Sequence, residues 1–315
     1  MRPLIDTTAI RLRPLGAIRV TGPDRLSYLH NMLSQSLADA AAGDVADFLH
    51  LDPKGVVQAL GRAVVHAESV LLTTTPDAVG DLAGTLDRMR FLTDVAVEDV
   101  SADLALASVR GPEVVVPGAR SEPMTAAPHG DGLVIRDRSG GVDLLGTRSW
   151  VLDRVEGLDL PEADEDDWET WRIQRGEPGW RTEVIPGRRP QELGLLPTHV
   201  HLRKGCYPGQ ESIAKTYNLG RPRRALAVIE LDGRPEPGAE VRVGDGSGEL
   251  TSIAPEGEPV AALGLLPVDR DSGAVLGDGT LTVGEVTGRV LRLVGADLPQ
   301  PGAGEPRARA GLLGR

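Results

Sequence analysis

Apolar residues in the first third of the chain follow helical spacing in two places and strand-like runs elsewhere. A helix is predicted after Thr21 and Asp24, which are residue types that start helices, and its apolar face is Leu26, Leu29, Leu33 and Leu37. A second helix is predicted to begin at Thr75 and Pro76. The strands predicted around these helices are 45–51, 56–65, 69–73, 95–100 and 104–109. This part should therefore mix helices and strands.

The middle of the chain is less regular, and the last third changes character. Residues 111–128 are rich in Gly and Pro and predict an irregular connection, followed by strands at 133–135 and 142–151. An acidic run at 162–167 suits the start of a helix that ends near Gly176. From Ala225 onward, short strands separated by Gly, Pro and Asp are typical of a small antiparallel barrel.

Composition narrows the class of protein without identifying it. The 315 residues carry a net charge of −12, which argues against broad non-specific binding to nucleic acid or to an anionic membrane. No uninterrupted apolar run approaches the roughly 18 residues that a membrane helix needs, and no secretion signal is recognisable at the start. We therefore expect a cytoplasmic protein without a membrane partner. Its one cysteine, Cys206, cannot form an internal disulfide.

The most informative string in the chain is KGCYPGQE, which consists of Lys204, Gly205, Cys206, Tyr207, Pro208, Gly209, Gln210 and Glu211. The two glycines bracket a tight turn, and a helix should begin at its last two residues. The helix start and the cationic neighbours Arg203 and Lys204 would both favour a thiolate at Cys206. The alternative is a small buried residue in a turn, which is the commoner role of a lone cysteine. We expect no metal site with His199 and His201, because no fourth ligand is visible.

This string resembles the signature K-G-C-Y-x-G-Q-E of the YgfZ family of folate-binding proteins, within the superfamily of the aminomethyltransferase of glycine cleavage. Residues 20–30, 104–112 and 248–252 also resemble segments of the superfamily. So do residues 171–178, together with Glu183 and residues 190–192, which precede the signature. The resemblance covers roughly residues 15 to 295.

The resemblance implies an α+β fold, in which interleaved α+β units bind folate and a C-terminal antiparallel β-barrel follows. The expected parts are residues 1–110 and 111–224 for the two α+β units, 225–295 for the barrel, and 296–315 for a disordered tail. The second part would carry the KGCYPGQE motif.

The resemblance also implies a tetrahydrofolate site. Asp143 matches the acid that accepts from two neighbouring pterin donors, and Arg172 matches an arginine of the family. Trp168 could stack on a flat ring, although a tryptophan at helical spacing from Trp171 is more often part of a core. For Asp143 the alternative is a polar residue on the solvent face of a strand.

The transferase reaction itself is not expected. The superfamily places acid–base carboxylates on a strand after a glycine turn, and here Gln58 and Ala59 fall at those positions. Neither side chain can exchange a proton as a carboxylate does.

The family instead implies assembly or repair of iron–sulfur enzymes, with Cys206 as the functional thiol and Lys204 beside it. The partners would be a reduced folate and iron–sulfur client or assembly proteins, with an indirect link to tRNA modification. Two alternatives stay open: a folate-dependent aminomethyltransferase or demethylase, and an interaction scaffold that has lost the folate.

Overall fold

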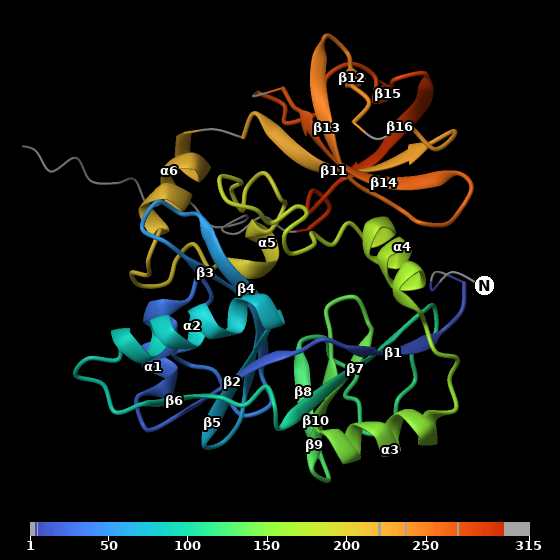
Figure 1. Cartoon of the computed structure of the whole chain (residues 1–315). Coiled ribbons are helices and arrows are strands. Elements are labelled where there is room, and N and C mark those ends of the chain that lie inside the picture. The colour runs from blue at the N-terminus through green and yellow to red at the C-terminus, as the bar shows by residue number, and fades with distance from the viewer. Residues whose placement is uncertain (1–3, 5, 220–221, 237, 270, 299–315) are drawn as a thin grey trace, which may run out of the picture.

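The computed structural model describes residues 4, 6–219, 222–236, 238–269 and 271–298. Two five-stranded sheets lie next to each other, and a closed barrel of six strands lies above them (Figure 1). This architecture confirms the predicted α+β class with a C-terminal antiparallel barrel. Residues 299–315, most of the predicted disordered tail, lie outside the described residues.

The first sheet has the order β3-β4-β5-β2-β6. Its strands are β2 (Gly16–Thr21), β3 (Val45–Leu51), β4 (Val57–Val65), β5 (Ser69–Thr74) and β6 (Ala96–Asp99). Helices α1 (Arg25–Met32) and α2 (Pro76–Met89) pack on it. The predicted first helix was too long, because the backbone becomes extended at Leu33. Leu33 and Leu37 are nevertheless buried in the same core as α1, which explains their helix-like spacing.

The second sheet has the order β1-β7-β10-β9-β8. Its strands are β1 (Ala9–Arg13), β7 (Leu104–Arg110), β8 (Thr125–His129), β9 (Gly132–Arg136) and β10 (Val142–Thr147). Because β1 and β7 come from the first third of the chain, the two α+β units are interleaved, as expected. The boundaries predicted between the parts of the chain remain predictions.

Two predictions in this region were wrong. The strand predicted at 142–151 ends at Thr147, whose side chain caps helix α3 (Arg148–Leu158) by accepting from the Trp150 N–H. The apolar pattern continued across this boundary and hid it. The stretch predicted to be irregular contains β8, whose alternate residues are only partly buried.

Helix α4 (Glu165–Arg175) connects the second sheet to the barrel, and a capping box between Asp164 and Asp167 starts it. Helices α5 (Leu196–His199) and α6 (Gln210–Leu219) follow. The barrel strands are β11 (Arg224–Leu231), β12 (Val241–Val243), β13 (Gly246–Ile253), β14 (Val260–Pro267), β15 (Thr280–Val283) and β16 (Val286–Leu293). The last two form a hairpin, so the single strand predicted at 281–294 was wrong.

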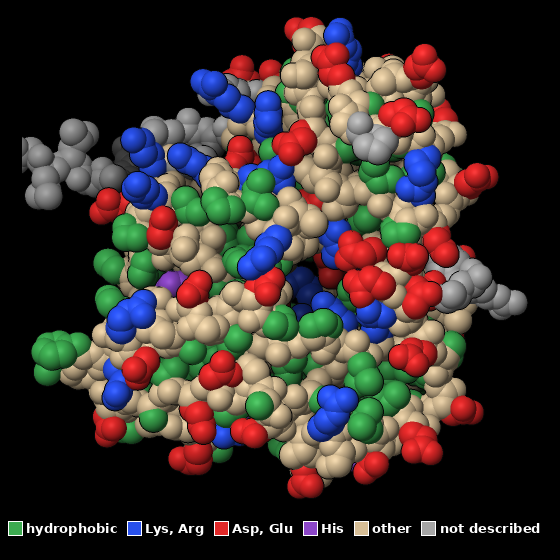
Figure 2. Space-filling view, in the orientation of Figure 1, with side chains coloured by type: hydrophobic (Ala, Val, Ile, Leu, Met, Phe, Trp, Pro, Cys, Tyr) green, Lys and Arg blue, Asp and Glu red, His purple; other side chains and the backbone are tan. Residues whose placement is uncertain are grey.

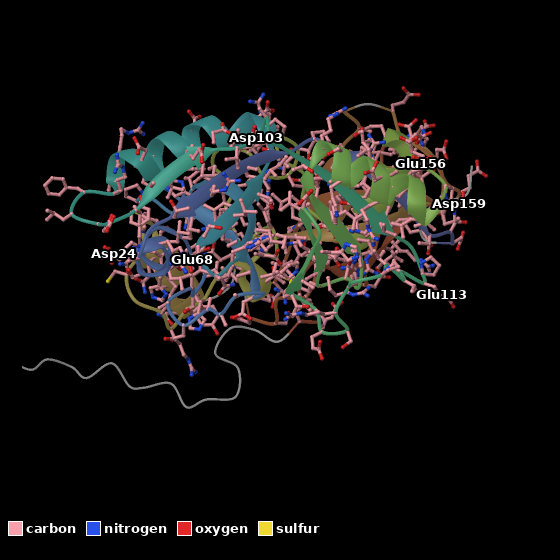
Figure 3. The ribbon with its side chains drawn as sticks, turned by 90° about the horizontal axis from the view of Figure 1, so that it is seen from below. Asp24, Glu68, Asp103, Glu113, Glu156 and Asp159 are labelled. Carbon is pink, nitrogen blue, oxygen red and sulfur yellow. The ribbon has the colours of Figure 1, made fainter. Side chains whose placement is uncertain are left out.

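Helices α2 and α3 lie along one side of the molecule, each over its own sheet (Figure 3). Within the described part of the chain, no helix has both the length and the apolar character needed to span a membrane. The barrel, the two sheets and the segments around α4 and α5 surround the middle of the molecule (Figure 1).

Candidate functional site

The KGCYPGQE loop is anchored on both sides of its cysteine. The Lys204 ammonium donates to the carbonyl oxygens of Leu33, at 2.7 Å, and of His30, at the end of α1. It also lies 4.8 Å from the centre of the Tyr207 ring, and Tyr207 is buried in an apolar cluster with Ile213 of α6. Cys206, between these two anchors, is exposed. The exposed thiol does not fit the alternative of a small buried residue.

Lys204 and Tyr207, which anchor this loop, and the neighbouring His30 all have pKa values shifted from their ordinary values. Burial lowers the pKa of the Lys204 ammonium to about 8, and the charge of Cys206 acts in the opposite direction. Burial, followed by Lys204 and His201, also lowers the pKa of His30, whose Nδ1 accepts from two backbone N–H groups. Burial raises the pKa of Tyr207 to about 12. The thiol therefore has a desolvated cation as its electrostatic neighbour.

Gly209 allows the motif loop to lie against the turn between β3 and β4. Its φ is +79°, and an added Cβ would lie 2.6 Å from the Asp52 carbonyl oxygen and 3.0 Å from the Gly55 Cα. Any other residue would be strained there and would push the two segments apart. The motif's glycine therefore joins this loop to the turn that leads into Gln58.

The strand after that turn carries no acid at the two positions where the superfamily places its carboxylates. The Gln58 side chain is exposed, and its amide nitrogen lies 3.4 Å from the Val56 carbonyl oxygen. Ala59 is 1% exposed and belongs to the core of the first sheet. These side chains offer no group that could accept and release a proton during a reaction.

Asp143 lies in a buried network of charges. Its Oδ1 accepts from the Ser108 hydroxyl at 2.7 Å and from Arg110 at 2.8 Å, and its Oδ2 accepts from Arg62 at 2.6 Å. Burial alone would raise the pKa of Asp143, but Arg110 and Arg62 outweigh it and hold that pKa below its ordinary value. A carboxylate has about four acceptor positions, and three are used here. A pterin edge that needs both oxygens would have to displace an arginine or the serine.

The network continues on both sides of Asp143 and joins the two sheets. Arg62 of β4 also pairs with Asp47 of β3 at 3.2 Å, and Arg110 of β7 also pairs with Asp137 at 2.8 Å. These residues were not predicted from the sequence, although charges within otherwise apolar strands were a usable signal. The network gives Asp143 a structural role whether or not it also contacts a ligand.

Arg172 connects α4 to the barrel. Its guanidinium donates to Glu169, to the Glu177 carbonyl oxygen, to Glu183 at 3.0 Å and to the Ser252 hydroxyl at 3.0 Å. Glu183 is fully buried. These contacts use all five N–H donors of an arginine, so a direct contact with folate would require one of them to break.

Trp168 is covered on two sides. The Trp171 ring lies 5.2 Å from it between centroids, and the Arg13 guanidinium lies 4.0 Å above its ring. Trp168 is 5% exposed and packs with Leu4 and Ala163 in a small apolar cluster. Arg110, which binds Asp143, is 5.5 Å from the same ring, so the structure brings Asp143 and Trp168 into one neighbourhood.

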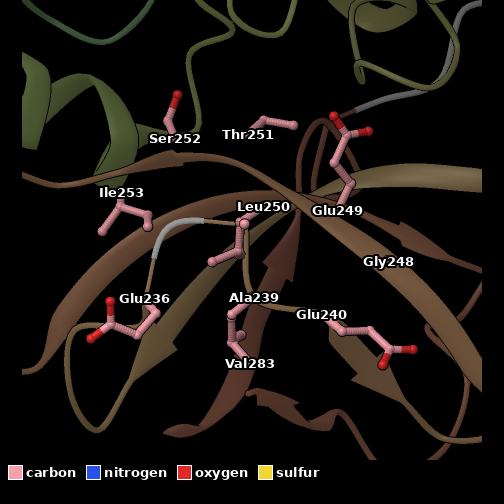
Figure 4. Close-up of a pocket in the computed structure, with 11 residues that line it drawn as sticks. Glu236, Ala239, Glu240, Gly248, Glu249, Leu250, Thr251, Ser252, Ile253 and Val283 are labelled. Atoms are coloured by element: carbon pink, nitrogen blue, oxygen red, sulfur yellow. The ribbon is translucent and has the colours of Figure 1, made fainter. Parts of the chain in front are cut away.

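Figure 2 shows a hollow near the middle of one face, between the barrel and the sheets, with Lys or Arg side chains at its bottom and charged side chains on its rim. A separate open cavity of about 590 Å³ lies in the barrel and is lined by β13 and by Glu236 and Glu240 (Figure 4). None of the predicted site residues lines the barrel cavity. Among the described residues, no group of three or more His, Cys, Asp or Glu side chains could hold a metal ion.

Known proteins are similar to this chain over most of its length. No family model matches. A chloroplastic protein of Arabidopsis thaliana, named as a transferase, is 26% identical over 88% of this chain and 68% of its own. The mitochondrial iron–sulfur cluster assembly factor IBA57 of Mus musculus is 27% identical over 75% of this chain and 70% of its own. The tRNA-modifying protein YgfZ of Colwellia psychrerythraea is 22% identical over 72% of each chain.

Among solved structures, the glycine cleavage aminomethyltransferase T of Bartonella henselae has the same fold. It superposes with a TM-score of 0.76 over 91% of this chain and 85% of its own, at 14% identity. The fold, the relatives named YgfZ and IBA57, and the KGCYPGQE loop agree. This chain is similar to YgfZ-type proteins and has the aminomethyltransferase fold.

Proposed function

We propose that this protein acts in the assembly or repair of iron–sulfur enzymes, and through them in tRNA modification, using the exposed thiol of Cys206 and a bound reduced folate. The names of its relatives support the first part, since one is an iron–sulfur cluster assembly factor and others are tRNA-modifying proteins. Its partners would then be iron–sulfur client or assembly proteins.

The presentation of Cys206 is the observation that carries this proposal. Lys204 and Tyr207 fix the loop from inside the protein, while the cysteine between them is exposed. A thiolate is the form of cysteine that attacks electrophiles and binds metals. An exposed thiol on a loop anchored by Lys204 and Tyr207 suits contact with a partner protein or its cluster.

The aminomethyltransferase fold supports the folate part of the proposal. A reduced folate would supply a carrier for one-carbon units. The side chains around Asp143 and Trp168 provide a carboxylate, guanidinium groups and aromatic rings, which are the groups that hold a pterin. Asp143 contributes one unused acceptor position at most, so other acceptors are needed.

The main alternative is a folate-dependent aminomethyltransferase or demethylase. Gln58 and Ala59 argue against it, because general acid–base groups contribute about 100- to 10,000-fold to a rate. We expect the purified protein to form no methylene-tetrahydrofolate from an aminomethyl carrier. Robust turnover in that assay would replace our proposal with the transferase alternative.

The test of Cys206 is complementation of cells that lack their own protein. The Cys206→Ser variant should fold and bind reduced folate like the wild type, yet fail to restore the activity of iron–sulfur enzymes. Full complementation by the serine variant would overturn the role of the thiol.

A titration with 5-formyltetrahydrofolate, followed by tryptophan fluorescence, tests the folate part. If no reduced folate binds while complementation succeeds, the protein is a scaffold that works without folate. The two experiments therefore separate the folate from the thiol.

A further inference from the structure

The barrel strand β13 lacks a neighbouring strand along part of one edge. Strand β14 pairs with it as far as Ile253, but the short strand β12 pairs on the other side only with residues 246–248. Residues 236 and 238–240 line the cavity opposite the remaining part. Among the described residues, no backbone hydrogen bond joins them to residues 249–253. We call residues 249–253 the free edge of β13.

The sequence opposite the free edge explains why no strand pairs there. Pro235 and Pro237 lie on either side of Glu236, and a proline has no backbone N–H to donate to a sheet. Gly238 follows with φ at +76°, in the left-handed region, which is not a strand conformation. A strand that pairs with the free edge therefore has to come from another segment.

The core of the barrel is incompletely covered beside the free edge. Leu266 and Val283 of the same core are 0% and 1% exposed, whereas Leu250 and Ile253 of β13 are only partly buried. Figure 4 shows Leu250 and Ile253 on one side of the cavity, with Ala239 and Val283 opposite them. The volume of about 590 Å³ is in the range of about 300–1,000 Å³ that is typical of ligand pockets. The cavity therefore has room for apolar side chains of a bound segment.

The rim of the cavity is acidic. Glu236, Glu240 and Glu249 line it, and no Lys or Arg does so in the part of the chain that the structure describes. Glu240 pairs with Arg242 at 3.0 Å and Glu249 with Arg188 at 2.7 Å, yet the two carboxylate side chains remain 61% and 50% exposed. Because such exposed pairs are weak, a further cationic side chain can still be attracted to this rim.

We propose that the free edge of β13 binds an extended segment of a partner protein, in which apolar residues alternate with Lys or Arg. The segment would add a strand of about five residues to the barrel and satisfy the backbone groups of the free edge. Since side chains of a strand alternate between its two faces, the apolar ones would enter the cavity beside Leu250 and Ile253, and the cationic ones would lie at the acidic rim.

Strand addition at an exposed sheet edge is a general mode of peptide recognition. The backbone hydrogen bonds supply affinity, and the contacts of alternate side chains supply specificity. Natural proteins usually protect such an edge, because it can also pair with unrelated chains. Binding at the free edge goes beyond the proposed function and requires neither Cys206 nor a folate.

Fluorescence anisotropy with labelled peptides and the full chain tests this inference. The probe is a peptide of alternating Lys and Val, about seven residues long, so that it spans the free edge. One control peptide alternates Glu and Val. A second control is the Lys–Val peptide with methylated backbone nitrogens, which keeps the side chains but cannot donate to a strand.

Paired charge reversals in the protein locate the binding site. Glu236→Lys combined with Glu240→Lys reverses two exposed carboxylates of the rim. The matched control combines Glu256→Lys with Asp271→Lys, two exposed barrel residues that do not line the cavity. Both double variants change the net charge equally, and about 0.15 M salt screens distant charges.

We expect the Lys–Val peptide to bind the wild type, and both control peptides to bind at least about tenfold more weakly. The rim variant should weaken the Lys–Val peptide by about tenfold, whereas the control variant should stay within about twofold of the wild type. These results together would support strand addition at the free edge.

Four results would overturn the inference. The first is that the Lys–Val peptide does not bind. The second is equal binding of the methylated peptide, which would show attraction of charges without strand pairing. The third is an equal loss in both double variants, which would show non-specific attraction to an acidic protein. The fourth is binding that occurs only after Arg307→Glu with Arg309→Glu, which would mean that the chain's own C-terminal residues occupy the free edge.

Discussion

Replacement of Asp143 by Asn tests whether the buried charge network holds the two sheets together. The substitution keeps the size of the side chain and removes the negative charge between Arg62 and Arg110. Removing one partner of a buried ion pair costs about 3–5 kcal/mol, because the other charge is left uncompensated. Each arginine keeps a second carboxylate, Asp47 or Asp137, so we expect the lower end of that range.

The measurement is urea unfolding at pH 7, followed by tryptophan fluorescence. The free energy of unfolding should fall by about 3 kcal/mol in Asp143→Asn. Asp103→Asn is the matched control, because Asp103 is exposed on the surface (Figure 3) and its change should stay within about 0.5 kcal/mol.

The same comparison in acid gives the sign of the electrostatic contribution. The pKa of Asp143 is lower in the folded protein than its ordinary value of about 3.9, so its contribution to stability is fully present above that pH. Below it, the unfolded chain takes up the proton first. The stability difference between wild type and Asp143→Asn should therefore be constant from about pH 5 to 7 and shrink by about 1.4 kcal/mol per pH unit below about 4.

Two results would refute this reasoning. A stability loss under about 1 kcal/mol at pH 7 would mean that the network does not need the charge of Asp143. A difference that grows on acidification would mean that the carboxylate is destabilised by the fold. A lost folate affinity with unchanged stability would show instead that Asp143 is a ligand contact.

Two further predictions concern Lys204 and Arg172. Because the folded pKa of Lys204 is about 8, below its ordinary value of about 10.4, the unfolded chain binds more protons between these values, and wild-type stability should rise with pH there. In urea unfolding at pH 7.5 and 9.5, the free energy of unfolding of Lys204→Met should not rise with pH. In the control variant Lys54→Met, at an exposed lysine, it should rise as in the wild type. An equal rise in both variants would contradict the prediction. Arg172→Met should lower the free energy of unfolding by about 3 kcal/mol, because the Glu183 carboxylate stays buried without its cation, while Arg148→Met should change it little. Unchanged stability in Arg172→Met, with lost folate affinity, would make Arg172 a ligand contact.

Local patterns along the chain predicted local structure well. The glycines and the polar residues of KGCYPGQE predicted a turn followed by a helix, and α6 begins at Gln210. Regular spacing of short strands predicted the barrel, although only the pairs β12/β13, β13/β14 and β15/β16 join consecutive strands, and the pairings of β11 with β14 and β16 and of β12 with β15 join strands that are distant in the sequence. The pattern failed where one apolar run served two elements, as at the boundary between β10 and α3.

The partners of the charged residues could not be predicted in this way. Arg62 and Asp143 are 81 positions apart, and Arg172 and Ser252 are 80 positions apart. A hydrophobic period describes which face of an element is buried, and it carries no information on which distant charge meets another. The charged residues of the network could have been noticed as interruptions of apolar strands, but not paired.

Resemblance places Asp143 in a folate site because of its position in the fold, but a position does not determine the partners of a side chain. At 14% identity to the transferase of Bartonella henselae, the fold is kept while most neighbours differ. Here Arg62, Arg110 and Ser108 occupy the Asp143 carboxylate, so one acceptor position at most is left on it for a ligand. A ligand needs acceptors that the protein has not already used. The number of acceptor positions that a carboxylate has free therefore indicates better than its position in the fold whether a folate could bind to it in this chain.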